Sequence, residues 1–290
     1  MGFENNTIRL LIKSAEKFNI DFTDSLTIGR QALHIDESLL KELLKENNIP
    51  IGPEFFKNDG YCEVFLKSIG AKIVDSMDAS SYENASIIHD MNTPVPDVLK
   101  NKYSCVIDGG TLEHVFNFPQ ALKNCMEMVK PNGYFITITP SNNFFGHGFY
   151  QFSPELFYRV FNQHNGFKMI NMYFFTEGIN STYYEVADPE VINGRTTLVN
   201  SKPSYLFVIA QKIESKKLFE VTPMQSDYVN IEWKGDHTFK NEGNSGSNIS
   251  MIKIIKLFLP SKIKTLLALL FRPTGISNQG HFKKINNDEI

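Results

Sequence analysis

The stretch Tyr103–Gly133, YSCVIDGGTLEHVFNFPQALKNCMEMVKPNG, most constrains what this chain can fold into. It starts with a short apolar run, Ser104–Ile107, typical of a strand buried on both faces. An Asp-Gly-Gly turn follows, and Pro119–Val129 then has apolar residues at helical spacing. Lys-Pro-Asn-Gly ends the predicted helix, and Tyr134–Thr139 forms the next strand. Such a strand–helix–strand unit predicts a helix-covered, mostly parallel sheet.

Candidate functional residues gather where these strands end. Asp108 directly follows the first strand, Glu113 and His114 lie in the loop after it, and Ser141–Asn143 follows the second strand. In an open α/β sheet, ligands occupy the crevice outside the carboxyl ends of the strands. We therefore expect these residues at one functional edge.

The same periodicities extend the pattern along the chain. Further helices are predicted at residues 6–18, 35–47, 61–69 and 154–165, the last with Ser153 as N-cap. Further strands are predicted at residues 24–29, 71–77, 86–89, 167–175 and 205–210. The last two strands have no helix between them and flank residues 177–203, which are too polar and irregular to assign. This succession predicts a doubly wound α/β sheet with an antiparallel edge strand.

With 290 residues, 42% of them hydrophobic, the chain can form one sizeable domain with appendages. We predict an N-terminal helix over residues 1–23, an α/β domain over 24–213, a polar linker over 214–249 and a helical tail over 250–290. Three cysteines without a CxxC pair argue against a disulfide framework or a zinc site, and no metal site is expected. The N-terminus has no secretory signal pattern, which favours a cytoplasmic protein.

The charge is distributed unevenly. The net charge is -3, but residues 243–287 carry seven basic residues and no acid, so residues 1–242 carry a net charge of -8. Such an acidic body argues against nucleic-acid binding. Residues 250–272 combine apolar clusters with lysines, and Pro260 divides them into two helices that are each too short to span a bilayer. The tail is predicted to attach the protein to an anionic membrane surface, peripherally at the inner face; alternatively it docks on its own domain or on a second subunit of a homodimer.

Several motifs carry a family resemblance. They are Leu112–Val115 (LEHV), Ala121-Leu122, Lys130–Gly133 (KPNG), Pro140, Tyr150–Glu155 (YQFSPE) and Gly166-Phe167. With them the chain resembles the class I S-adenosylmethionine-dependent methyltransferases, in particular the small-molecule and glycan-modifying branch, over roughly residues 26–210. The resemblance implies a seven-stranded sheet with S-adenosylmethionine lying across the ends of the first four strands.

The resemblance also implies cofactor-binding residues. Asp78, with Asp75 as second choice, matches the acid that grips both ribose hydroxyls, since a carboxylate accepts two hydrogen bonds from a diol. Asp90 matches the acid facing the adenine amine, with Met91 beside the ring.

The chain departs from the family at the first strand, where a glycine-rich run is expected and Gly29-Arg30-Gln31-Ala32-Leu33 stands instead. Either Arg30 contacts the methionine carboxylate directly, or the pocket is altered or closed.

Three residues are candidates for catalysis, each with an alternative role. His114 suits a general base, or it caps the helix together with Glu113. Asp108 lies near the expected methyl-transfer site, or it forms the turn before two glycines. His147, in an aromatic and glycine-rich loop, covers the acceptor or is simply solvated.

Together these features predict S-adenosylmethionine-dependent methyl transfer to a sugar or related small acceptor, in a surface-glycan or other secondary pathway. The glycan assignment rests on the family analogy and the tail. The alternative is an inactive methyltransferase-like binding or scaffold protein with an altered cofactor pocket.

Overall fold

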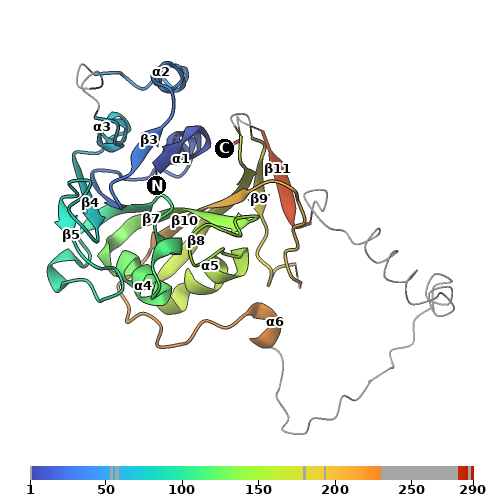
Figure 1. Ribbon diagram of the computed structural model, residues 1–290. Helices are drawn as coiled ribbons and strands as arrows, with labels where there is room; N and C mark the ends of the chain where they lie inside the picture. Colours follow the sequence, from blue (N-terminus) through green and yellow to red (C-terminus); the bar gives the residue numbers. More distant parts are fainter. Residues whose placement is uncertain are drawn as a thin grey trace, which may run out of the picture.

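A large mixed sheet organises the chain. The computed structural model describes residues 2–52, 55, 59–178, 181–192, 194–229, 280–286 and 289–290. Within these residues the sheet has nine strands in the order β11-β9-β8-β10-β7-β6-β2-β4-β5 (Figure 1).

Five neighbouring strands are parallel: β7 (Val129–Asn142), β6 (Tyr103–Asp108), β2 (Asp24–Ile28), β4 (Ile73–Asp78) and β5 (Ile87–Ile88). The chain runs from β2 to β4 and β5 on one side, and then crosses to the other side for β6 and β7. The strand order therefore reverses between β2 and β6. Their carboxyl ends form the switch point where ligands bind in open α/β sheets.

The other half of the sheet is antiparallel. β10 (Ser204–Lys212) lies between β7 and β8 (Phe167–Thr176), followed by β9 (Tyr183–Val186) and β11 (Phe282–Ile285). The prediction of seven mostly parallel strands is therefore wrong: the described sheet is mixed and nine-stranded. Two short strands cause the difference, β9 inside the unassigned segment 177–203 and β11 near the C-terminus. Because of them, the antiparallel edge of the sheet is β11 and not one of the two strands predicted there.

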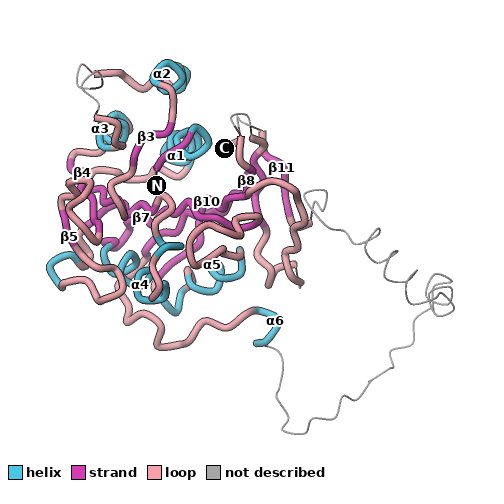
Figure 2. The backbone as a smooth tube through the Cα atoms, viewed as in Figure 1, coloured by secondary structure: helices cyan, strands magenta, loops and turns pink. Residues whose placement is uncertain are grey.

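Helices cover both faces of the sheet (Figures 1 and 2). The helices α4 (Phe118–Met128) and α5 (Pro154–Val160) lie on one face, and α1 (Asn5–Lys17), α2 (Glu37–Glu46) and α3 (Glu63–Ser68) lie on the other. Each face has its own core. In β6, Val106 packs into the first core while Cys105 and Ile107 pack into the second, as alternation along a strand requires.

Most predicted elements of the α/β unit are confirmed within a few residues. The helix predicted at 119–129 is α4, and the strand predicted at 104–107 is β6. The helix ends earlier than the Lys-Pro-Asn-Gly signal implied, because β7 begins at Val129 and already contains that stretch. Ser153 occupies the N-cap position of α5, but its side chain makes no capping hydrogen bond.

A small parallel sheet, absent from the prediction, lies beside the switch point. It pairs β1 (Gly2–Glu4) with β3 (Ala32–His34). Phe3 is fully buried in the second core, so this pairing holds the N-terminal segment near the loop that follows β2.

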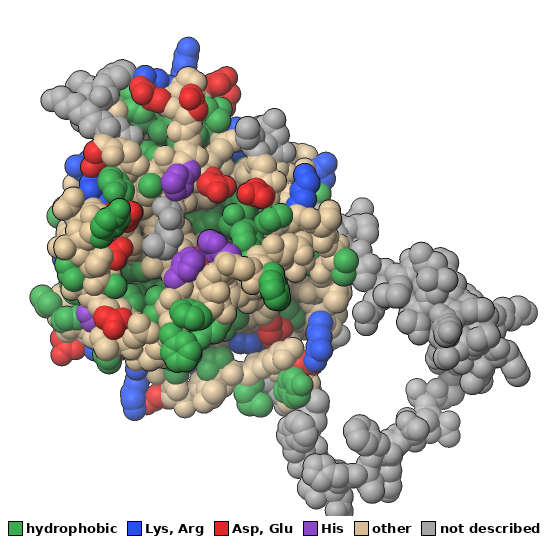
Figure 3. All heavy atoms as spheres, in the orientation of Figure 1, with side chains coloured by type: hydrophobic (Ala, Val, Ile, Leu, Met, Phe, Trp, Pro, Cys, Tyr) green, Lys and Arg blue, Asp and Glu red, His purple; other side chains and the backbone are tan. Residues whose placement is uncertain are grey.

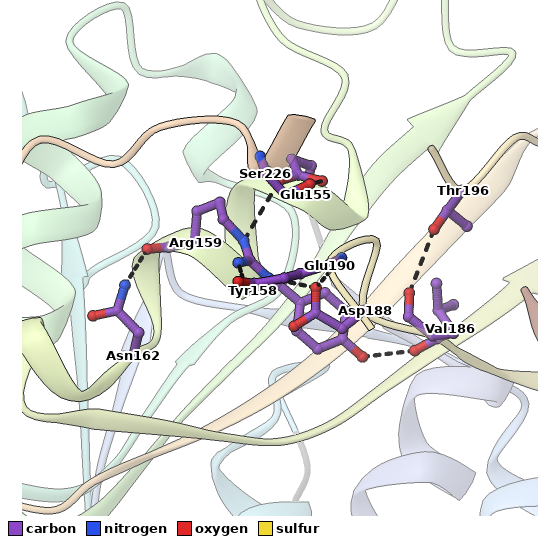
Figure 4. Close-up of polar contacts among 10 residues, drawn as sticks. Glu155, Tyr158, Arg159, Asn162, Val186, Asp188, Glu190, Thr196 and Ser226 are labelled. Atoms are coloured by element: carbon purple, nitrogen blue, oxygen red, sulfur yellow. Dashed lines mark hydrogen bonds and ion pairs between the residues drawn. The ribbon is translucent and has the colours of Figure 1, made fainter. Parts of the chain in front are cut away.

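An arginine cluster joins α5 to distant segments (Figure 4). The Arg159 guanidinium contacts Asp188 and Glu190 after β9, and its Nε lies 3.4 Å from Glu155 Oε1. Glu155 in turn accepts a hydrogen bond from the Ser226 N–H at the start of α6 (Ser226–Val229). A hollow of about 1170 Å³ beside Arg159 lies towards the amino-terminal edge of the parallel strands. It therefore stands apart from the edge expected to bind ligands.

The predicted membrane segment 250–272 lies outside the described residues, and so does most of the tail. The described part near the end of the chain forms β11, which is a strand. Among the described residues, no helix combines the length and apolar character needed to cross a membrane.

Candidate functional site

The turn after β6 is built on Asp108. Its carboxylate is fully buried and accepts hydrogen bonds from the Thr111 N–H at 2.9 Å and from the Thr137 hydroxyl at 2.7 Å. Oδ1 also accepts from the Leu112 N–H at 3.3 Å. Burial raises the pKa of this carboxyl. Of the two roles open to Asp108, these contacts support the turn-forming one.

The short helix that follows, η3 (Leu112–His114), buries a second carboxyl group. Glu113 is only 1% exposed, and its Oε2 has no hydrogen-bond partner among the described residues. Burial, and then the charge of nearby Asp108, raise the pKa of Glu113. A buried polar atom without a partner is costly and points to a group that the protein is built to receive.

The loop after β7 brings a histidine to this carboxyl group. The Glu113 carbonyl accepts a hydrogen bond from the Phe149 N–H at 2.8 Å. Next to it, Gly148 has a φ of 70°, and a Cβ there would lie 2.8 Å from that same carbonyl oxygen. Only glycine combines this backbone conformation with so close an approach. The loop consequently places His147 Nε2 3.4 Å from Glu113 Oε1.

His114 completes the group. Its Nε2 lies 4.0 Å from Glu113 Oε1, and its ring centroid lies 4.8 Å from that of His147. Burial, and then the neighbouring His147, lower the pKa of His114, which favours the neutral imidazole near neutral pH. We call Glu113, His114 and His147 the histidine–glutamate cluster. It joins the two predicted catalytic histidines, His114 and His147, while the third predicted catalytic residue, Asp108, supports the turn below them.

A pocket of about 250 Å³ opens beside this cluster. On the face drawn in Figure 3, histidine and acidic side chains lie around a recess with hydrophobic side chains at its base. Beyond the cluster and the Gly109-Gly110 turn, the pocket is lined by Glu4, Thr7, His34, Phe175 and Tyr205, among others. The Phe175 and Tyr205 rings stack with centroids 5.4 Å apart. The pocket therefore combines polar groups with aromatic side chains, as small-molecule sites commonly do.

Arg30 does not face this pocket. Its guanidinium is paired with Asp59 and Glu63, each at 2.6 Å, and lies 3.9 Å from the centroid of the Tyr61 ring. It is thus occupied within its own loop. Of the two alternatives for the first strand, direct contact of Arg30 with a methionine carboxylate is disfavoured, and an altered pocket is favoured.

Gln31 is the residue that alters the switch point. It is fully buried, and its amide nitrogen donates to the Ile28 carbonyl and, at 3.3 Å, to the Thr111 hydroxyl. A Cβ on Gly109 would lie 2.5 Å from Gln31 Oε1, so this side chain fills the space between the ends of β2 and β6. Gln31 Oε1 itself has no hydrogen-bond partner among the described residues.

The predicted adenosine residues lie at the ends of neighbouring strands. Asp78 ends β4 and accepts from the Ser80 N–H at 3.1 Å, while Asp90 follows β5 and accepts from Asn92. Met91 is buried in the first core. The second choice for the ribose, Asp75, is bonded to the Tyr103 hydroxyl at 2.7 Å and is therefore engaged elsewhere.

S-adenosylmethionine fits these residues in part. Gly29, with a φ of 75°, turns the chain sharply after β2, and Asp78 and Asp90 remain at the edge for the adenosine. At the methionine end, the unpartnered Gln31 Oε1 is an acceptor of the kind an α-ammonium group requires. The fit at that end requires the Gln31 side chain to share or leave its space.

The sequence placed Glu113 at the functional edge without selecting it as a site residue, and Glu4 and His34 were not expected there. Gln31 was named only as part of the departure from the glycine-rich run, without a role of its own. The signal for Glu113 was its position beside His114 at a strand end. No local signal identifies Glu4 and His34, because the pairing of β1 with β3 brings them to the pocket.

No family model matches this chain, and no curated protein matches it significantly. Solved structures with a similar course of the chain include a SAM-dependent methyltransferase from Thermotoga maritima, with 13% identity, a TM-score of 0.35, and coverage of 72% of this chain and 91% of that one. TehB from Haemophilus influenzae has 13% identity and a TM-score of 0.36, covering 70% of this chain and 61% of TehB.

A branched-chain polyamine synthase from Thermus thermophilus, solved with 5'-methylthioadenosine, has 10% identity and a TM-score of 0.38; 74% of this chain and 57% of the synthase are covered. TM-scores below 0.5 at such identities do not establish an activity. The function is therefore argued from the residues of the site.

Proposed function

We propose that this protein transfers a methyl group from S-adenosylmethionine to a hydroxyl group of a small acceptor, a sugar or a related molecule. The observation that carries the proposal is the pocket beside the switch point, where the histidine–glutamate cluster faces a small polar cavity. Methyl transfer needs the acceptor oxygen deprotonated and held close to the methyl donor, and positioning supplies much of the rate effect.

The pocket supports a small acceptor. Its volume of about 250 Å³ suits a single sugar ring more than a polymer segment. Phe175 and Tyr205 line one side of the pocket with aromatic surface, while Glu4, Thr7 and His34 offer hydrogen-bonding groups. Such a combination binds the apolar face and the hydroxyl edge of a sugar at the same time.

S-adenosylmethionine, when bound, supplies the electrophilic methyl group. Asp78 would hold the ribose, Asp90 the adenine, and Gln31 Oε1 the ammonium group of the methionine. The histidine–glutamate cluster would take the proton of the acceptor hydroxyl, since His114 is kept neutral by its surroundings. Asp108 would hold the segment that carries Glu113 and His114, since it accepts hydrogen bonds from the Thr111 N–H next to that segment and from the Thr137 hydroxyl in β7.

A second candidate function is supported by Gln31 and Arg30. Gln31 fills the switch point, and Arg30 forms ion pairs with Asp59 and Glu63. With the cofactor position altered in this way, the protein would bind a small ligand beside the cluster without converting it to a product. In that case the protein acts as a binding or scaffold partner. A surface-glycan pathway and attachment to a membrane through residues 250–272 remain part of the proposal for either function.

Titration calorimetry with S-adenosylmethionine and its demethylated product tests the choice. We expect binding by the wild type and at least a tenfold loss of affinity in Asp78→Ala, because one carboxylate no longer holds the two ribose hydroxyls. Asp97→Ala is the control, since the Asp97 side chain is 95% exposed and forms an ion pair with Lys100 on the surface. No binding by the wild type, or equal binding by Asp78→Ala, would favour the scaffold function.

A further inference from the structure

The histidine–glutamate cluster has the composition of a metal site. Its three donor atoms, one from each residue, all lie within 4.8 Å of one another. Glu113 Oε1 lies 3.4 Å from His147 Nε2 and 4.0 Å from His114 Nε2. An ion with bonds of about 2.1 Å to a tetrahedral set holds its ligand atoms roughly 3.4 Å apart. Small side-chain rotations would therefore close these atoms around one ion.

The burial of Glu113 gives a second, independent indication. The Glu113 side chain is only 1% exposed, yet its Oε2 has no hydrogen-bond partner among the described residues. The hydrogen bond that joins the two loops uses the Glu113 backbone carbonyl, which accepts from the Phe149 N–H, and not the carboxylate. A buried carboxylate oxygen without a partner is costly, and a cation held between Glu113 and the two imidazoles would compensate for it.

We propose that Glu113, His114 and His147 bind a divalent transition-metal ion whose open coordination positions face the 250 Å³ pocket. Two histidines and one carboxylate are a donor set for zinc or ferrous iron, and three protein ligands leave positions for a substrate oxygen. The sequence-based expectation of no metal site was drawn from cysteines and did not consider these three residues.

The ion gives the pocket a chemical preference, and this part rests on the proposed function. An acceptor with a hydroxyl group beside a second oxygen would bind through both oxygens. With the ion bound, the three side chains are its ligands and no longer accept the proton of the acceptor, as they would without it. The ion instead lowers the pKa of the bound hydroxyl, so that its proton leaves to solvent near neutral pH and the oxygen becomes the nucleophile. The substrate class we infer is therefore a small chelating polyol or hydroxy acid.

The test is metal binding by the untagged full-length protein after dialysis against a chelator, with Co²⁺ as a spectroscopic probe and Zn²⁺ as competitor. We expect one equivalent of Co²⁺, visible absorption bands of a protein-bound ion, and their loss on adding Zn²⁺. His147→Ala should lower the affinity at least tenfold. Its melting temperature without metal should stay unchanged, because the His147 side chain is 49% exposed.

Glu113→Gln should also lose the absorption bands while keeping nearly the same shape in the buried position. His164→Ala is the control, since this exposed histidine lies outside the pocket and should leave the affinity unchanged. Absence of stoichiometric uptake by the wild type, or equal affinity in His147→Ala, would overturn the inference.

The two proposals fail separately. Metal binding is measured without S-adenosylmethionine, and cofactor binding is measured in the presence of chelator. Uptake of Co²⁺ without any cofactor binding would leave the metal site standing and remove the methyl-transfer proposal. Cofactor binding without uptake of Co²⁺ would do the reverse.

Discussion

Lys212 is a cation held inside the protein. It is 3% exposed at the end of β10, and its Nζ donates to Asn101 Oδ1 and to the carbonyls of Met126 and Val129 at 2.8–3.0 Å. Burial lowers the pKa of this lysine to about 8. These hydrogen bonds connect the end of β10 to the junction between α4 and β7 and to Asn101, which precedes β6.

The pH dependence of stability should reveal this lysine. Between pH 8 and 10.5 the unfolded chain keeps the Lys212 proton that the folded chain has lost, so the Lys212 contribution to the free energy of unfolding rises with pH. We expect this free energy to rise by roughly 1–3 kcal/mol more in the wild type than in Lys212→Met across that window.

Urea denaturation at several pH values measures the difference. The comparison with Lys212→Met is essential, because burial raises the pKa of Cys105 and Cys125, which titrate with the opposite effect on stability. Parallel pH profiles of the two proteins would contradict the assignment.

At the scale of the element, the loop between β7 and α5 decides whether the cluster exists. Gly148 and Gly146 flank His147 in the same loop, but only Gly148 has a positive φ and touches the Glu113 carbonyl. A Cβ at Gly146 meets nothing within 4 Å. The position of His147 therefore depends on one close backbone approach.

Gly148→Ala should displace this loop. We expect it to weaken Co²⁺ binding at least tenfold, because His147 moves away from Glu113 while its side chain remains present. Gly146→Ala is the matched control and should bind as the wild type does. Equal affinities in the two variants would show that the loop conformation does not set the site.

At the scale of the whole molecule, β11 closes the sheet with residues from the far end of the chain. Phe282 and Ile285 are 3% and 4% exposed, and the Phe282 ring lies 5.5 Å from that of Phe174. Lys283 and Lys284, between them on the strand, are exposed. Phe282 packs into the first core and Ile285 into the second, so β11 contributes to the cores on both faces of the sheet at its edge.

Phe282→Ala should destabilise the protein by about 2–4 kcal/mol, through lost burial and the cavity left beside Phe174. Lys283→Ala, on the opposite face of the same strand, should change the free energy of unfolding by less than about 0.5 kcal/mol. Guanidinium denaturation measures both. A small effect of Phe282→Ala would show that β11 is not firmly attached to the sheet.

Much of the central fold could be predicted from local patterns. Strands β2, β4 and β6 and helix α4 have apolar spacing and turn residues that suffice to place them. β9 and β11 could not be predicted, because short strands in polar or terminal segments form only through backbone pairing with a partner far along the chain. The mixed character of the sheet depends on such pairings.

The candidate site shows the same division. The sequence alone determined that Asp108, Glu113 and His114 stand at a strand end, since the Asp-Gly-Gly turn after an apolar run is a local feature. Only the tertiary structure decided that Asp108 supports the loop and that His147, 34 residues after Glu113 in the chain, meets its carboxylate. It likewise decided that Gln31 fills the switch point. Contacts between distant segments depend on side-chain volume and backbone approach in three dimensions, which no periodicity encodes.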